Sequence, residues 1–189
     1  MTEQTIKNTV DNLLRAPAEL KFKLPAALED IKAYGVGRLL EERPDFLERL
    51  LVQIRKADAA RVFQEKGAAE QFPDVFWEGI RFRAEASASM KALLAKAERD
   101  IHVNIEASDS PFACHFVVEK GTLRGANGLL HFKDEDFRFM GPTETLVDMF
   151  LGDLQLGFSN LRLQTAGHSG WMSRVGPILR EVTKLIKGG

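Results

Sequence analysis

The chain has 189 residues, of which 44% are hydrophobic and 28% are charged, so its composition is that of a globular protein and excludes a disordered or fibrous chain. Its 26 Lys and Arg residues are balanced by 27 Asp and Glu residues, and this near-neutral charge argues against a domain that binds nucleic acid. The single cysteine, Cys114, excludes a disulfide within the chain and a structural zinc site made of cysteines alone.

Residues 1–90 carry the spacing of helices. Pro25 and Pro44 each suit the first turn of a helix, because proline lacks an N–H that the first turn leaves unbonded. Apolar residues recur at helical spacing from Phe46 to Ile54 and again from Phe72 onward, with a break expected near residue 88. This part of the chain is therefore predicted to be a helical region of unknown role.

The hydrophobic period changes to two near Asp100. Apolar and polar residues alternate over 101–106 and over 112–119, which predicts two half-buried strands. Further strands are expected at 129–132 and 136–140, and glycine turns at 120–121 and 125–128. The change of period is the clearest boundary in the sequence and gives two predicted domains, residues 1–90 and 91–189.

Helical spacing returns after Gly141. Thr143 is expected to cap a helix that has the acidic Glu144 in its first turn. A short helix or turn at 154–158, a short strand at 161–165 and a closing helix over 171–187 should follow. Pro177 is a candidate for the true start of the closing helix.

No specific catalytic motif is present in the sequence: there is no phosphate-binding glycine loop, no dinucleotide fingerprint, no zinc-protease motif and no nucleophile elbow. Three histidines, at positions 102, 115 and 131, lie on expected strands and suggest a metal site. His115 and Cys114 are neighbours on a strand and point to opposite faces, so they cannot bind the same ion. We therefore predict no metal and no cofactor.

Two other groups have a catalytic interpretation and a structural one. Cys114 could be a nucleophile, but it shares a strand face with Phe112 and Phe116, so we expect a buried, unreactive thiol. The acidic residues 134–136 could bind a cation, but a solvated turn between strands is the simpler interpretation. We predict that the protein is not an enzyme.

Apolar side chains gather near the C-terminal elements. The chain has 13 Phe residues and one Tyr, and many of its Phe, Met and Trp residues lie between positions 137 and 172. They could form an ordinary phenylalanine-rich core, or they could line a cavity for an apolar ligand, since such pockets are mostly apolar. Both interpretations remain open at this point.

The order of elements from Ile101 onward resembles the sterol carrier protein 2 (SCP2) family. Residues 116–121 resemble the family's central hairpin, and residues 136–140 resemble one of its strands. Residues 144–152 resemble its helix that ends in glycine, and residues 154–165 resemble the short helix and strand that follow. It implies a strand meander, two helices, one more strand and a final helix, with a lipid held between sheet and helices.

We therefore predict an α/β (α+β) protein, with a helical N-terminal region followed by an SCP2-like, mainly antiparallel sheet that has helices packed on one face. The predicted function is non-catalytic binding or carriage of a lipid, fatty acyl or sterol-like molecule. The alternative is an interaction or assembly module without a cavity. The predicted ligand-binding residues are Phe137, Phe139, Leu146, Met149, Phe150, Phe158, Leu161, Leu163, Trp171, Met172 and Val175.

The sequence also gives expectations about location and partners. Residues 1–10 lack the apolar core of a signal peptide, and no apolar run approaches the roughly 18–20 residues of a membrane span. Together with the single cysteine, this predicts a cytoplasmic protein. The N-terminal helices are a candidate surface for a homodimer.

Overall fold

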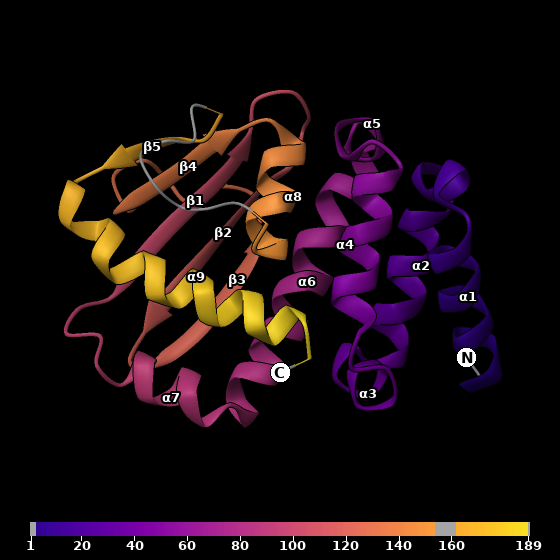
Figure 1. The fold of residues 1–189 in the computed structure, drawn as a ribbon, viewed down its shortest axis with the longest axis horizontal. Helices are drawn as coiled ribbons and strands as arrows, with labels where there is room; N and C mark the ends of the chain where they lie inside the picture. Colours follow the sequence, from indigo (N-terminus) through magenta and orange to yellow (C-terminus); the bar gives the residue numbers. More distant parts are fainter. Residues whose placement is uncertain (1–2, 154–161, 189) are drawn as a thin grey trace.

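The computed structural model describes residues 3–153 and 162–188 and separates the chain into a helical part and a sheet part (Figure 1). The helices before Asp100 are α1 (Glu3–Arg15), α2 (Leu20–Tyr34), α3 (Val36–Glu42), α4 (Phe46–Lys56), α5 (Ala59–Phe63), α6 (Lys66–Ala86) and α7 (Ala88–Leu94), with a 3-10 turn, η1 (Pro17–Glu19), before α2. All the described strands follow Asp100, where the hydrophobic period changes from helical to alternating.

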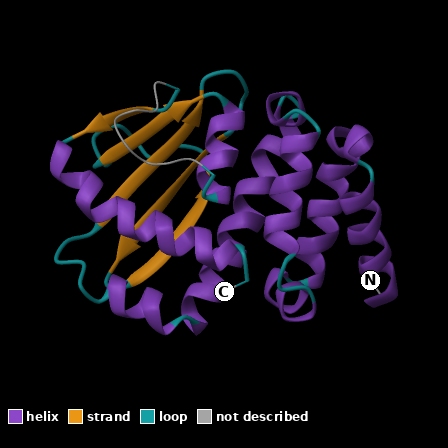
Figure 2. Cartoon of the chain, in the orientation of Figure 1, coloured by secondary structure: helices purple, strands orange, loops and turns teal. Residues whose placement is uncertain are grey.

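The second part is a five-stranded sheet in the described residues, with helices between and after its strands (Figure 2). Its elements are β1 (Ile101–Ala107), β2 (Ala113–Glu119), β3 (Thr122–Asn127), β4 (Phe137–Gly141), α8 (Thr143–Leu151), β5 (Gln164–Gly167), η2 (Ser169–Trp171) and α9 (Met172–Ile186). The strand order is β3-β2-β1-β4-β5, and all described pairs are antiparallel except β1 with β4. The predicted fold class, helices followed by a mainly antiparallel sheet with helices packed on it, is confirmed.

One face of the sheet is apolar and covered by helices. Side chains of β1, β2 and β4 alternate, so Val103, Phe116 and Phe139 point to the same face and are fully buried. Helices α8 and α9 cross this face in Figure 1, and Trp77 of α6 packs against Phe116 in a tilted arrangement with ring centres 5.2 Å apart. The buried apolar residues form one cluster that runs from α1 to α9. The division at residue 90 remains a prediction.

Two prolines do not start helices as we expected. Pro25 lies inside α2, which begins at Leu20, and Pro177 lies inside α9, which begins at Met172. Leu20 and Leu24 are buried on the same helix as Leu28, so the apolar face continues through the proline. Burial of these side chains outweighs the backbone hydrogen bond that proline lacks.

Three predicted segments near the sheet differ in the structure. The expected strand at 129–132 is a loop, because the side chain of Asn104 binds both backbone groups of Leu130. The expected turn at 125–128 is wrong at its start, since β3 continues to Asn127. The strand expected at 161–165 lies later in the structure, as β5, Gln164–Gly167, which shares only its first two residues with the expected range.

The start of α8 is held from outside the helix. Thr143 was expected to cap it, but Thr143 is the first helical residue and its backbone N–H donates to Asp109 at 2.8 Å. Its hydroxyl donates to the same carboxylate at 2.5 Å. Asp109, from the β1–β2 turn, thus supplies the acceptor that a cap normally provides.

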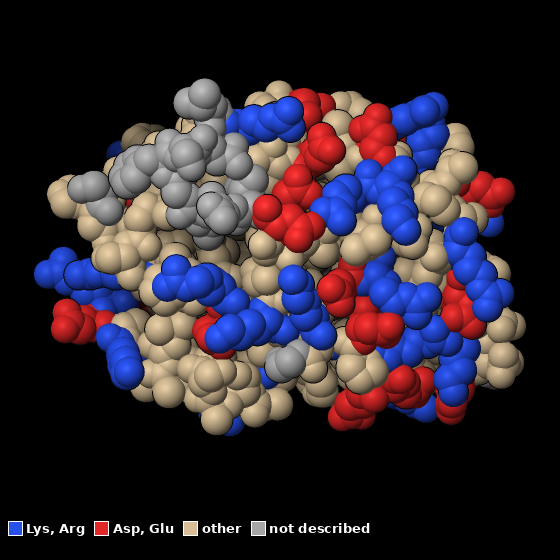
Figure 3. Space-filling model, viewed as in Figure 1, with Lys and Arg blue, Asp and Glu red and all other residues tan. Residues whose placement is uncertain are grey.

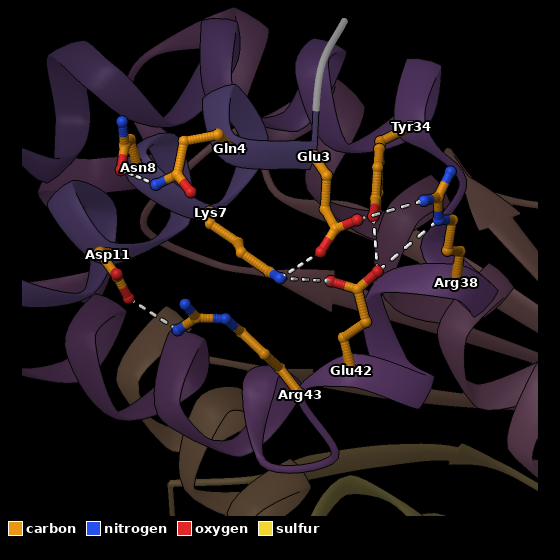
Figure 4. A network of polar contacts seen from close by, with 9 residues as sticks. All are labelled: Glu3, Gln4, Lys7, Asn8, Asp11, Tyr34, Arg38, Glu42 and Arg43. Atoms are coloured by element: carbon orange, nitrogen blue, oxygen red, sulfur yellow. Dashed lines mark hydrogen bonds and ion pairs between the residues drawn. The ribbon is translucent and has the colours of Figure 1, made fainter.

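Charged side chains join α1, α2 and α3 on the outer side of the helical part (Figure 4). Glu42 lies 3.9 Å from Lys7 and 3.6 Å from Arg38, and it accepts a hydrogen bond from Tyr34 at 2.5 Å. Arg43 binds Asp11 at 2.6 Å and holds the pKa of that carboxyl below its usual value. In this network every acidic group faces a basic one. Among the described residues, no helix combines the length and apolar character needed to cross a bilayer.

Candidate functional site

The structure brings together many of the residues predicted to bind a ligand. Six of them, which we call the apolar layer, lie in the buried cluster between sheet and helices and are at most 3% exposed: Phe137, Phe139, Leu146, Met149, Phe150 and Val175. Phe137 and Phe139 of β4 are in ring contact, with centres 4.9 Å apart. The apolar layer is therefore a contiguous part of the core.

The other predicted residues lie at its margin or outside the described part. Leu163, Trp171 and Met172 are half-buried and pack against the same cluster. Phe158 and Leu161 fall within 154–161, outside the described residues. The surface hollows beside Gly121, along α7 and α9, and beside Phe22 are lined by residues other than those of the apolar layer.

Helix α6 contributes to this region, which the sequence analysis missed. Phe150 of α8 contacts both Phe76 and Trp77 of α6, with ring centres 4.7 Å and 6.1 Å away. A Cβ atom at Gly125 would lie 2.5 Å from the ring of Trp77, so only glycine allows this approach. Glycine within a strand can mark such a close approach, but we expected Gly125 to lie in a turn.

The indole N–H of Trp77 has no hydrogen-bond partner among the described residues, although Trp77 is only 1% exposed. A buried donor without an acceptor costs about 1–3 kcal/mol, so such groups are rare and call for an explanation. The thiol of Cys114 lies beside this donor as a neighbouring acceptor, but the contact lacks the geometry of a hydrogen bond and sulfur is a weak acceptor. An oxygen atom of a bound molecule would satisfy this donor.

Cys114 is buried, as its strand position predicted. It is 1% exposed, and burial raises the pKa of its thiol to about 12, with a small opposing effect from Trp77. A thiol in this state is protonated at neutral pH and is a poor nucleophile.

The opposite face of the sheet is polar and internally paired. His102 lies 3.2 Å from Asp136 and 3.4 Å from Glu119, while Arg138 pairs with Glu135 at 2.9 Å and with Glu106 at 3.0 Å. The expected turn at the acidic residues 134–136 is present and Asp134 is exposed, but Glu135 and Asp136 are half-buried because they bind Arg138 and His102. Within residues 3–153 and 162–188, no three His, Cys, Asp or Glu side chains are placed to hold a metal ion.

No protein-family model matches the chain, and no curated protein matches it significantly. Its function therefore has to be inferred from its own residues. A chemically unusual feature of the described residues lies beside the apolar layer, namely the buried indole N–H of Trp77 without a hydrogen-bond partner.

Proposed function

We propose that this protein binds a lipid or another apolar small molecule between its sheet and helices α6, α8 and α9, without catalysing a reaction. The observation that carries the proposal is the buried indole N–H of Trp77, which lacks an acceptor and lies in ring contact with Phe150 of the apolar layer. A fatty acid or phospholipid has the matching chemistry, because an apolar chain ends in carboxyl or ester oxygens that accept hydrogen bonds.

The side chains of the apolar layer suit such a ligand. Met149 is unbranched and can change rotamer at low cost, and its neighbours on α8, Leu146 and Phe150, are also apolar. Each methylene group that a ligand buries contributes about 0.8 kcal/mol, so an acyl chain needs no charged site for affinity. Room for the chain would come from movement of these side chains.

The order of elements also supports the proposal. Strands β1 to β4 precede α8, and β5 precedes α9. The resemblance to the SCP2 family implies two helices between these strands, of which α8 is one, while the expected short helix or turn at 154–158 lies outside the described residues. That family holds its ligand between sheet and helices. Family membership itself remains part of the proposal.

Native mass spectrometry of the protein purified without detergent tests the proposal directly. We expect an additional mass that corresponds to a lipid and disappears after organic extraction. A protein that carries no such mass, and that does not bind a fluorescent fatty acid after purification, would contradict the proposal.

Substitution of Met149→Trp tests where the ligand lies. If the apolar layer opens to admit a chain, the larger ring should occupy that space, block uptake of the fatty acid and leave the free energy of unfolding nearly unchanged. If the layer is a permanently filled core, overpacking should cost about 1–3 kcal/mol, and the unchanged protein should take up no probe either. Met90→Trp is the matched control, since Met90 is also fully buried but lies on α7.

A second candidate function is an assembly module, and one observation favours it. Phe22 on α2 is 71% exposed and lines a hollow with Pro17 and Ala18. A second copy of the chain could cover this residue, which would make the N-terminal helices a dimer surface. Sedimentation equilibrium should then show a dimer that Phe22→Ser converts to a monomer, and a monomeric unchanged protein would dismiss this candidate.

A further inference from the structure

Helices α7 and α9 lie side by side and leave a groove between them. One part of this groove has a volume of about 290 Å³ and a floor of apolar residues that includes Leu93, Ala97 and Ile178. The second part, of about 330 Å³, shares Leu93, Lys96 and Pro177 with the first, so the two parts are continuous. We call this surface the α7–α9 groove.

The rim of the α7–α9 groove is basic. Five exposed cationic side chains line it, against the acidic Glu98 and Glu181: Lys96, Arg99, Arg174, Arg180 and Lys184. Of these five, only Lys184 pairs with a carboxylate of the described residues, at 2.5 Å from Glu181. Four positive charges on this rim are therefore not neutralised by described neighbours.

The helical part of the protein shows the opposite arrangement. There, Lys and Arg side chains interleave with Asp and Glu, whereas the surface over α9 is mostly basic (Figure 3). Arg55, for example, binds Asp148 at 3.1 Å and Asp153 at 2.5 Å, and the network of Figure 4 pairs its basic groups with acids. With a net charge of −1 over the whole chain, the basic rim is a local feature.

We propose that the α7–α9 groove docks on the surface of a phospholipid bilayer that contains anionic lipids. Anionic headgroups complement the four unpaired cations, and the apolar floor can contact the acyl carbons next to the headgroups. Trp171, half-buried at the start of α9 with the guanidinium of Arg174 at 5.1 Å from its ring centre, has the amphipathic character favoured at this depth. The apolar floor favours a bilayer over a nucleic acid, which would need polar contacts there.

The docking extends the proposed function. It rests on that function only for the idea that the bilayer supplies the ligand. Helix α9 has its basic side on the rim, while Val175 on its buried side belongs to the apolar layer. A molecule that leaves the bilayer at this helix would therefore have a short path to the layer.

Sedimentation with vesicles tests the docking. We expect the full chain to bind vesicles of mixed phosphatidylcholine and phosphatidylglycerol, to leave vesicles of pure phosphatidylcholine unbound, and to dissociate at high salt. Each Lys or Arg near an anionic surface raises the affinity about fivefold, so Arg174→Glu/Arg180→Glu should weaken binding at least about 25-fold. Both residues are exposed, so circular dichroism should show an intact fold.

The matched control is Lys56→Glu/Arg61→Glu. These two residues are exposed, form no ion pair with described carboxylates, and lie away from the groove, on α4 and α5. Their substitution changes the net charge of the protein by the same amount. The control should keep its affinity for the mixed vesicles. Equal loss in both variants, equal binding to both vesicle types, or binding to a DNA duplex but to neither vesicle type would each overturn the proposal.

The two proposals are distinguished by uptake of a fluorescent fatty acid in the absence of vesicles. The Arg174→Glu/Arg180→Glu protein should take up the probe as the unchanged protein does. If neither protein takes up the probe but vesicle binding depends on the two arginines, the proposed function fails and the docking stands.

Discussion

Asn104 uses its whole side-chain amide to hold the loop over residues 128–136. It is fully buried, accepts a hydrogen bond from the backbone N–H of Leu130 at 2.8 Å, and donates to the carbonyl of Leu130 at 3.1 Å. It also donates to the carboxylate of Glu135. The sequence did not predict the burial of Asn104, because an asparagine at a polar position of an alternating strand is expected to face solvent. The partner that buries it comes from a segment predicted to be a strand.

We expect Asn104→Leu to destabilise the protein by about 2 kcal/mol, because it leaves the two half-buried backbone groups of Leu130 without their partners. Asn127→Leu is the control, since Asn127 is exposed at the end of β3, and it should change the free energy of unfolding by less than about 0.5 kcal/mol. Urea unfolding curves measure both values. Equal small effects would mean that the loop does not depend on Asn104.

Cys114 should resist thiol reagents in the native protein. With its pKa raised to about 12 by burial, the thiol is neither ionised nor accessible at neutral pH, so labelling should become rapid only in urea. Because the unfolded thiol ionises above its ordinary pKa of 9.0 while the folded one stays protonated, Cys114 should also reduce stability as the pH rises above about 9. Cys114→Ala should lack this contribution. Fast labelling of the native protein at neutral pH would contradict the expected burial.

Helix α6 illustrates what the sequence can and cannot reveal about an element. The spacing of Phe72, Phe76 and Ile80 predicted a helix, because a helix shows its buried side as a local period. That α6 covers the sheet depends on the fit between Trp77 and Gly125, two residues far apart in the chain, and local spacing carries no information about such pairs. The strand periods were likewise found, but the parallel pairing of β1 with β4 was not.

Gly125→Ala should therefore be strongly destabilising. The added methyl group would lie 2.5 Å from the Trp77 ring and 2.7 Å from the carbonyl oxygen of His115, and overpacking of this kind costs about 1–3 kcal/mol. The same substitution at Gly176 of α9 is the control, because the nearest atom there, on Arg180, is 3.8 Å away. Gly176→Ala should be neutral or stabilise the helix by up to about 1 kcal/mol. Thermal unfolding followed by circular dichroism compares the two.

At the scale of the whole molecule, polar contacts reinforce the shared core of the helical part and the sheet part. Arg55 of α4 binds Asp148 of α8 and Asp153 just after it. Arg83 of α6 donates to the carbonyls of Leu185 and Pro44, and the burial that this requires lowers the pKa of its guanidinium. The change of period near Asp100 correctly located the start of the sheet, but period alone says nothing about how much surface the two parts share.

Because the buried cluster is continuous, we expect one cooperative unfolding transition. Helix content, measured by far-ultraviolet circular dichroism, and the fluorescence of Trp77 and Trp171 should change at the same urea concentration. Helices are abundant before residue 100, whereas Trp171 reports on the sheet part. Two separate transitions would instead support independent domains at residues 1–90 and 91–189.

The contact between Arg83 and Leu185 also has a consequence for the order of folding. The two residues are 102 positions apart, and closing a loop of that length costs about 4 kcal/mol of chain entropy before any contact is gained. Helices α1 to α3 contact other helices of the first 86 residues and can assemble early, whereas the end of α9 reaches Arg83 from the far end of the chain. The slowest step in refolding should therefore be the docking of α9, and until it occurs the part of the apolar face that α6 and α8 leave open is exposed and prone to aggregation.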